Sequence, residues 1–248
     1  MPNGPQTRLE TAISRPRDPA ATSEWVRGIQ KYMMYFLRKD ATFPKRCAVA
    51  ISPMTAVTYE DGGNSQLKER HFNDERTFSN GDYLELYFLF DEKRKPVRTE
   101  VVLTSGLSDF ILLEATDGQM FFHGDIEQHN FEVPQEGQEI LCIGLTNETV
   151  SQQAIAHGVV QNDVPDKRDH IVADFITWPA DSGGGVFSRT NSFLVIVSAL
   201  ICPKGKKDKF NYTRTHVVSL MIIKHGWKTF LESSGKVAGY SGIRPEEE

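Results

Sequence analysis

From Arg46 onward the chain is a succession of short apolar runs separated by turn residues, and this pattern restricts its fold more than any other feature. Residues 83–90, for example, are rich in aromatic side chains and follow the turn Asn80-Gly81-Asp82. Many short strands at this spacing, with helical patterns only at the two ends, predict an all-β barrel or sandwich. The expected strands cover residues 47–52, 83–90, 97–104, 110–114, 139–145, 154–160, 171–176, 193–202 and 216–223.

Helical patterns border this β region on both sides. Apolar residues at helical spacing begin at Trp25, after a suitable N-cap at Ser23, and predict a helix that extends to about Arg38. Its apolar stripe would pack on the domain behind it, and the alternative is a helix that binds a partner. A second, short helix is expected around residues 227–231.

The two ends of the chain have the composition of flexible segments. Residues 1–21 contain four prolines and few apolar residues, and residues 233–248 are rich in glycine and glutamate. We therefore expect a leader (1–21), an N-terminal helix (22–39), one β domain (40–232) with lobes at about 40–125 and 126–232, and a tail (233–248).

Composition excludes several classes of protein. The 39% hydrophobic and 25% charged residues are those of a soluble globular protein, and 248 residues can bury a sizeable core. A net charge of −5 argues against nucleic acid as a partner, although Lys204, Lys206, Lys207 and Lys209 form a local basic run. No apolar stretch reaches the ~18 residues of a membrane span, so no membrane association is expected.

The compartment and the cofactors follow from what the sequence lacks. No apolar signal segment follows Met1, and the three cysteines suit neither a zinc site nor a disulfide framework. We expect an intracellular protein, cytoplasmic or nuclear, that is not secreted. The phosphate-loop, dinucleotide and zinc-protease motifs are missing, so no cofactor and no metal is predicted. Asp61, Asp109 and Asp181 lie too far apart in the sequence to argue for a cation site.

The string Asp181-Ser182-Gly183-Gly184 carries the main chemical signal. Its glycines permit positive φ and close backbone approach. The string resembles the nucleophile loop of the chymotrypsin-like (trypsin-fold) serine peptidases, and this resemblance implies a serine that attacks a carbonyl while its own N–H faces the oxyanion. This resemblance covers roughly residues 46–231 and implies two six-stranded β-barrels, here with an added N-terminal helix and a short C-terminal helix. In that family the catalytic residues follow the order His, Asp, Ser along the chain.

The catalytic aspartate has a counterpart in this chain. The segment from Leu107 to Leu113 resembles the family segment Asp-x-x-Leu-Leu, in which the carboxylate precedes a buried strand. The resemblance implies that Asp109 would orient an imidazole and balance its charge. The alternative is an ordinary turn aspartate ahead of a strand.

The catalytic histidine has no such counterpart. Residues 48–62 resemble the family segment that ends in this histidine, and the alignment places Asp61 in its position. A carboxylate with a pKa near 4 is a weak base for Ser182 at neutral pH, and loss of one triad member costs on the order of 10⁴- to 10⁶-fold in rate. The resemblance therefore implies a catalytically inactive member, a pseudoprotease. The alternative is an active serine endopeptidase in which His71 supplies the base or Asp61 takes part in an unusual arrangement.

The remaining positions of the site also depart from the family pattern. The oxyanion hole would use the N–H groups of Ala180 and Ser182, and Ala180 replaces the usual glycine. In the substrate pocket, Ile176 removes any preference for basic residues, while Ser198 lies on the strand that pairs with substrate and Leu200 would intrude. By elimination, we expect a protein-interaction or scaffold module whose former cleft or N-terminal helix binds a protein or peptide.

Overall fold

The computed structural model describes twelve segments of the chain, and every structural statement below concerns these segments. They comprise residues 19–37, 45–60, 78–91, 93–105, 108–123, 131–145, 153–167, 169–175, 181–190, 193–201, 214–218 and 220–235.

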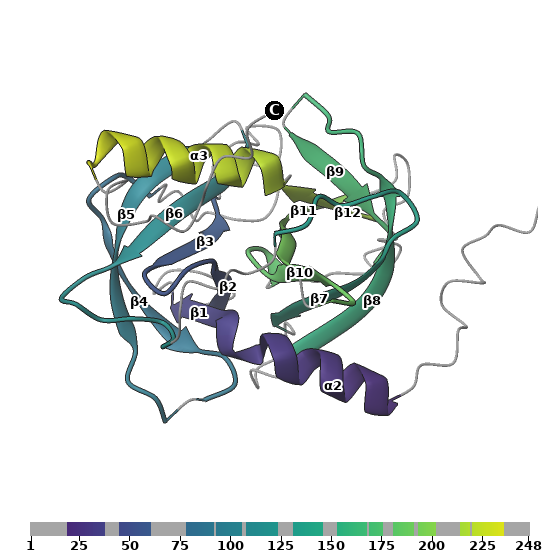
Figure 1. The fold of residues 1–248 in the computed structure, drawn as a ribbon, viewed down its shortest axis with the longest axis horizontal. Coiled ribbons are helices and arrows are strands. Elements are labelled where there is room, and N and C mark those ends of the chain that lie inside the picture. Colours follow the sequence, from purple (N-terminus) through teal and green to yellow (C-terminus); the bar gives the residue numbers. More distant parts are fainter. Residues whose placement is uncertain are drawn as a thin grey trace, which may run out of the picture.

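The strands of these segments form two closed antiparallel barrels of six strands each (Figure 1). The first contains β1 (Met33–Leu37), β2 (Lys45–Ala50), β3 (Thr55–Tyr59), β4 (Tyr83–Phe88), β5 (Val97–Ser105) and β6 (Phe110–Ala115). The second contains β7 (Glu139–Leu145), β8 (Gln153–Asn162), β9 (His170–Ala173), β10 (Gly185–Ser188), β11 (Phe193–Ile201) and β12 (Arg214–Val218). The predicted all-β double barrel is confirmed.

Both barrels have the same strand order. In the first barrel the neighbours run β1-β2-β3-β6-β5-β4, and in the second they run β7-β8-β9-β12-β11-β10. Pairing of β1 with β4 closes the first barrel, and pairing of β7 with β10 closes the second. The second six strands thus repeat the connectivity of the first six.

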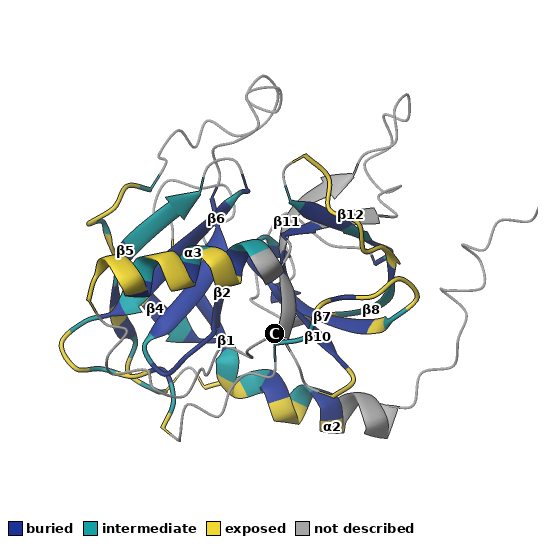
Figure 2. Ribbon diagram, turned by 45° about the horizontal axis from the view of Figure 1, so that its top comes forward, coloured by how far each residue is buried: buried dark blue, intermediate teal, exposed yellow. Residues whose placement is uncertain are grey.

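Strands at the junction of the barrels are apolar on both faces. In β6, Ile111 and Leu113 belong to the core inside the first barrel, whereas Phe110 and Leu112 belong to a larger core that continues into the second barrel. Successive side chains of a strand point to opposite faces, so such a strand must be apolar throughout. Figure 2 shows β2 and β6 almost entirely in the colour of buried residues.

Two α-helices lie on opposite sides of the molecule (Figure 1). Helix α2 (Pro19–Ile29) continues into the short helix η1 (Gln30–Tyr32). The Trp25 ring of α2 packs edge-on against the His157 ring of β8, with 5.8 Å between the ring centroids. Helix α3 (Leu220–Ser233) packs across β5 and β6, and a Cβ on Gly226 would lie 2.9 Å from Leu103 Cδ2. The glycine lets the helix approach the first barrel.

The predicted N-terminal helix over residues 22–39 is wrong in its second half. The helix ends at Ile29, and the run Met33–Leu37 forms β1, paired with β2 from Met33↔Val49 to Leu37↔Lys45. Met33–Leu37 is apolar on both faces because it separates the two cores, and such a run matches a helical stripe as well as a buried strand. The first barrel therefore begins at Met33, before the predicted boundary at residue 40.

The C-terminal elements also differ from expectation. Helix α3 begins at Leu220, so it is longer than the predicted helix at residues 227–231. The predicted strand over residues 216–223 ends at Val218 as β12. Strands β3 and β10, which are only five and four residues long, were not predicted.

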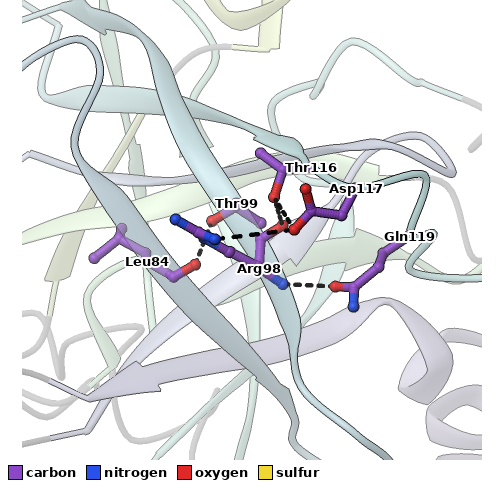
Figure 3. Close-up of polar contacts among 6 residues, drawn as sticks. All are labelled: Leu84, Arg98, Thr99, Thr116, Asp117 and Gln119. Carbon is purple, nitrogen blue, oxygen red and sulfur yellow. Dashed lines mark hydrogen bonds and ion pairs between the residues drawn. The ribbon is translucent and has the colours of Figure 1, made fainter.

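At one end of the first barrel, a polar network ties the chain after β6 to β5 (Figure 3). The Arg98 N–H donates to Gln119 Oε1 at 2.9 Å, and Thr116 Oγ1 donates to the Arg98 carbonyl at 3.2 Å. On the next residue of β5, Thr99 Oγ1 donates to the Leu84 carbonyl of β4 at 3.0 Å. The Arg98 guanidinium is 4.0 Å from Asp117, but both side chains are more than half exposed, so this ion pair adds little stability.

Candidate functional site

The structure places some of the candidate residues and not others. Asp109 lies between β5 and β6, and Ser182 lies between β9 and β10. Ser198 and Leu200 lie on β11, where the backbone is described but their side chains are not. Four candidates lie outside the described residues: Asp61, His71, Ile176 and Ala180.

Asp109 occupies a left-handed turn immediately before β6. Its φ is 59°, a conformation that aspartate tolerates better than most non-glycine residues. Its carbonyl accepts a hydrogen bond from the Glu60 N–H at 3.2 Å, which extends the β3–β6 pairing one step beyond Tyr59↔Phe110. This hydrogen bond therefore fixes Glu60, the residue after β3, against Asp109. In the sequence, Asp61 directly follows Glu60.

The Ser182 turn lies between the two barrels. The Gly184 N–H donates to the Asp181 carbonyl at 2.7 Å, and Gly183 has a φ of 81°. A Cβ on Gly183 would overlap the Cys47 carbonyl oxygen of β2 and lie 2.5 Å from Thr58 Oγ1 of β3. Only glycine fits this position for two reasons. A side chain would overlap atoms of the first barrel, and other residues rarely adopt this positive φ.

These contacts bring the Ser182 turn and Asp109 to the same strand. Gly183 packs at Thr58, and Asp109 pairs with Glu60, two residues further along the chain. Two residues of a strand span about 7 Å. The described parts of the candidate triad thus converge at the exit of β3, where the segment with Asp61 and His71 begins.

Asp181 is buried beside the second barrel and influences two thiols. A Cβ on Gly144 of β7 would overlap the Asp181 carboxylate. Burial raises the pKa of Cys47 and of Cys142 well above the usual range, and the negative charge of Asp181 raises both further. Both thiols are buried and stay protonated at neutral pH, so neither has the thiolate character of a nucleophile.

A polar contact between the barrels holds the residue before Asp109. Ser108 Oγ donates to Asp169 Oδ2 at 3.2 Å, and His170 Nε2 lies 3.4 Å from the Ser108 carbonyl oxygen. Ser108 and His170 are both buried. Sequence reasoning missed this contact, because its partners lie 61 and 62 residues apart and no local motif connects them.

Glu60 was also missed. It is 7% exposed, and its Oε2 has no hydrogen-bond partner among the residues that the structure describes. Burial raises the pKa of its carboxyl. The only signal in the sequence is its position between the apolar residues of β3 and Asp61, which is equally typical of a turn.

Metal-binding and membrane-spanning features were sought in the same segments. Within the described part of the chain, no three His, Cys, Asp or Glu side chains form a group that could hold a metal ion. None of the helices found there is both long enough and apolar enough to cross a bilayer.

Comparison with known proteins gave no assignment to a family. No protein-family model matches the chain, and no curated protein matches it. The fold and the site define an all-β double-barrel protein with a serine-bearing turn at the junction of its barrels.

Proposed function

We propose that this double barrel is of the trypsin type and that the protein is a pseudoprotease, which binds a protein or peptide and does not cleave it. Two observations support the trypsin type. The strand order is the same in both barrels, and the three candidate catalytic positions follow the family's order relative to the strands. The segment with Asp61 follows β3, Asp109 precedes β6, and Ser182 precedes β10. This is the His, Asp, Ser order of the family, with the first two positions in one barrel and the serine in the other.

The hydrogen bond from the Glu60 N–H to the Asp109 carbonyl is the observation that carries the proposed loss of activity. It fixes the pairing of β3 and β6 up to Glu60, the residue before Asp61 in the sequence. On this proposal, the family's histidine position is therefore taken by a second carboxylate beside Asp109. Two neighbouring carboxylates cannot take the Ser182 proton at neutral pH as an imidazole can. The alternative base, His71, lies eleven residues after Glu60 in the sequence, well beyond the last residue that this hydrogen bond pairs with the Asp109 turn.

Strand β11 supports the proposed binding of a peptide. It pairs with β10 only as far as Ile196, and it pairs with β12 from Ile196 to Ile201. Along residues 197–201, no strand of the described segments pairs with β11 on the β10 side. An extended peptide can add a strand at such an edge, where backbone hydrogen bonds supply affinity.

The loss of activity is tested with a fluorophosphonate probe, which labels an activated serine. We expect no labelling of the wild-type protein at pH 7–8, with Ser182→Ala as the blank. Asp61→His should gain labelling that requires Ser182, because it supplies an imidazole at the position that the alignment gives to the family's catalytic histidine. Labelling of the wild type that disappears in Ser182→Ala would refute the pseudoprotease.

Peptide binding is tested separately. A peptide selected on the wild-type protein from a random library should lose affinity when its alternate backbone amides are N-methylated, because strand addition needs those N–H groups. Leu200→Gly should change the affinity, since this residue lies in the stretch of β11 that pairs with β12 but with no described strand on the β10 side. Equal binding of every N-methylated peptide would contradict this mode.

The alternative function is an active serine endopeptidase with His71 as its base. The intact geometry of the Ser182 turn favours it: Gly183 retains a φ of 81°, and the Gly184 N–H closes the turn on Asp181. On this alternative the wild-type protein would be labelled by the probe, and both Ser182→Ala and His71→Ala would abolish the labelling.

A further inference from the structure

Glu60 is a buried carboxyl at the junction of β3 and β6. The residue is 7% exposed, its Oε2 has no hydrogen-bond partner within the described segments, and its N–H donates to the Asp109 carbonyl at 3.2 Å. A buried carboxylate is costly unless a cation or several donors stabilise it, whereas a neutral carboxyl costs much less. The geometry therefore suits the protonated form of Glu60.

The titratable and charged groups around this junction come from several elements. Arg46 of β2 donates its Nε–H to the hydroxyl of Tyr59, the neighbour of Glu60. Asp109 lies on the β5–β6 turn, while Asp169 and His170 contact Ser108 from the second barrel. Asp181 precedes Ser182 on the turn that packs against β3. The raised pKa of Glu60 comes from burial, and none of these groups is its cause.

We propose that the end of β3 is a proton-linked latch, held closed by neutral Glu60 and opened when Glu60 ionises. The latch comprises the Glu60 N–H···O=C Asp109 hydrogen bond and the two residues that make it. Ionised Glu60 is stabilised once water reaches its carboxylate, so it favours the arrangement in which the chain at Glu60 leaves the Asp109 turn. This inference goes beyond the proposed function, because it holds whether or not Ser182 reacts.

The direction of the pH dependence follows from the raised pKa. In the unfolded or opened state the carboxyl ionises near pH 4, whereas in the closed state it holds its proton to higher pH. The closed state is therefore favoured most at acidic pH, and it loses this advantage as pH rises from about 4 through the pKa of the closed state. Each unit by which the pKa is raised corresponds to a tenfold change in the equilibrium.

The test is amide hydrogen exchange of Glu60 between pH 4 and pH 8, expressed as a protection factor so that the intrinsic pH dependence of exchange is removed. In the wild type, protection of the Glu60 amide should be lower at pH 8 than at pH 4, because the closed state loses its advantage as Glu60 ionises. In Glu60→Gln, which keeps the shape and removes the charge, protection should stay constant. The matched control is Glu136→Gln, at an exposed site before β7, which should behave as the wild type.

A direct titration keeps the proposal testable even if Glu60→Gln folds poorly. The ¹³C resonance of the Glu60 carboxyl should titrate at higher pH in the folded wild-type protein than in the same protein unfolded in urea. A Glu60 carboxyl that titrates at the same pH in the folded and unfolded protein would overturn the latch. Equal loss of protection in the wild type and Glu60→Gln would also overturn it, because the pH dependence would then belong to another group.

Discussion

Single glycines decide how closely the Ser182 turn approaches the first barrel. Gly183 has a φ of 81°, and a Cβ there would overlap the backbone carbonyl of Cys47. Gly137 has nearly the same backbone, with a φ of 84°, but nothing lies within 4 Å of the position its Cβ would take. Comparing the same substitution at the two positions therefore separates the free-energy cost of the positive φ from the cost of steric overlap.

We expect Gly183→Ala to lower the free energy of unfolding by roughly 2–4 kcal/mol, since it combines the left-handed backbone penalty with overpacking against a rigid carbonyl. Gly137→Ala should cost only the backbone penalty, about 1–2 kcal/mol. Urea unfolding of both variants measures the difference. Equal losses would mean that the Ser182 turn does not press against β2.

At the scale of one residue, the sequence could predict the chemistry of the turn but not the surroundings of its neighbours. Ser182 and its glycines form a local motif, and the structure has the tight turn that the motif predicts. Glu60 and His170 are polar residues that a reader of the sequence would place at the surface, yet both are buried. Their burial depends on how two barrels dock, and no nearby residue encodes it.

At the scale of the element, strands were predictable where turn residues separated them and ambiguous where both faces were buried. β5 and β7 follow turn signals and lie close to their predicted bounds. The run Met33–Leu37 joins directly to a helix and is apolar on both faces, so periodicity could not distinguish strand from helix. Pairing with β2 decided the outcome, because tertiary contacts override local preference.

Helix α3 offers a test of how an element docks on the first barrel. Gly226→Val should lower the free energy of unfolding by about 1–3 kcal/mol, because even the first added carbon would lie 2.9 Å from Leu103 and 3.0 Å from Phe110. His225→Val places the same side chain on the exposed face of the helix and should change stability by at most about 0.5 kcal/mol. Thermal unfolding of the two variants compares them. A stable Gly226→Val would show that α3 can move away from the barrel without loss.

At the scale of the whole molecule, one core connects the two barrels. Leu112 of β6 shares a buried cluster with residues of β7, β10 and β12, whereas its neighbour Leu113 belongs to the cluster inside the first barrel. Both side chains are fully buried, so they differ mainly in the face of the strand that they occupy. The pair can therefore reveal whether the barrels are stabilised jointly.

We expect Leu112→Ala and Leu113→Ala each to lower stability by about 2–5 kcal/mol, the usual cost of a cavity at a buried leucine. Native-state hydrogen exchange should distinguish them. Leu112→Ala should reduce protection in both barrels, because the shared core loses contacts on both sides of the junction. Leu113→Ala should reduce protection more in β4 and β5 than in β8 and β9. The same pattern of loss in both variants would mean that the two barrels unfold only as one cooperative unit, so that the shared core does not stabilise one barrel apart from the other.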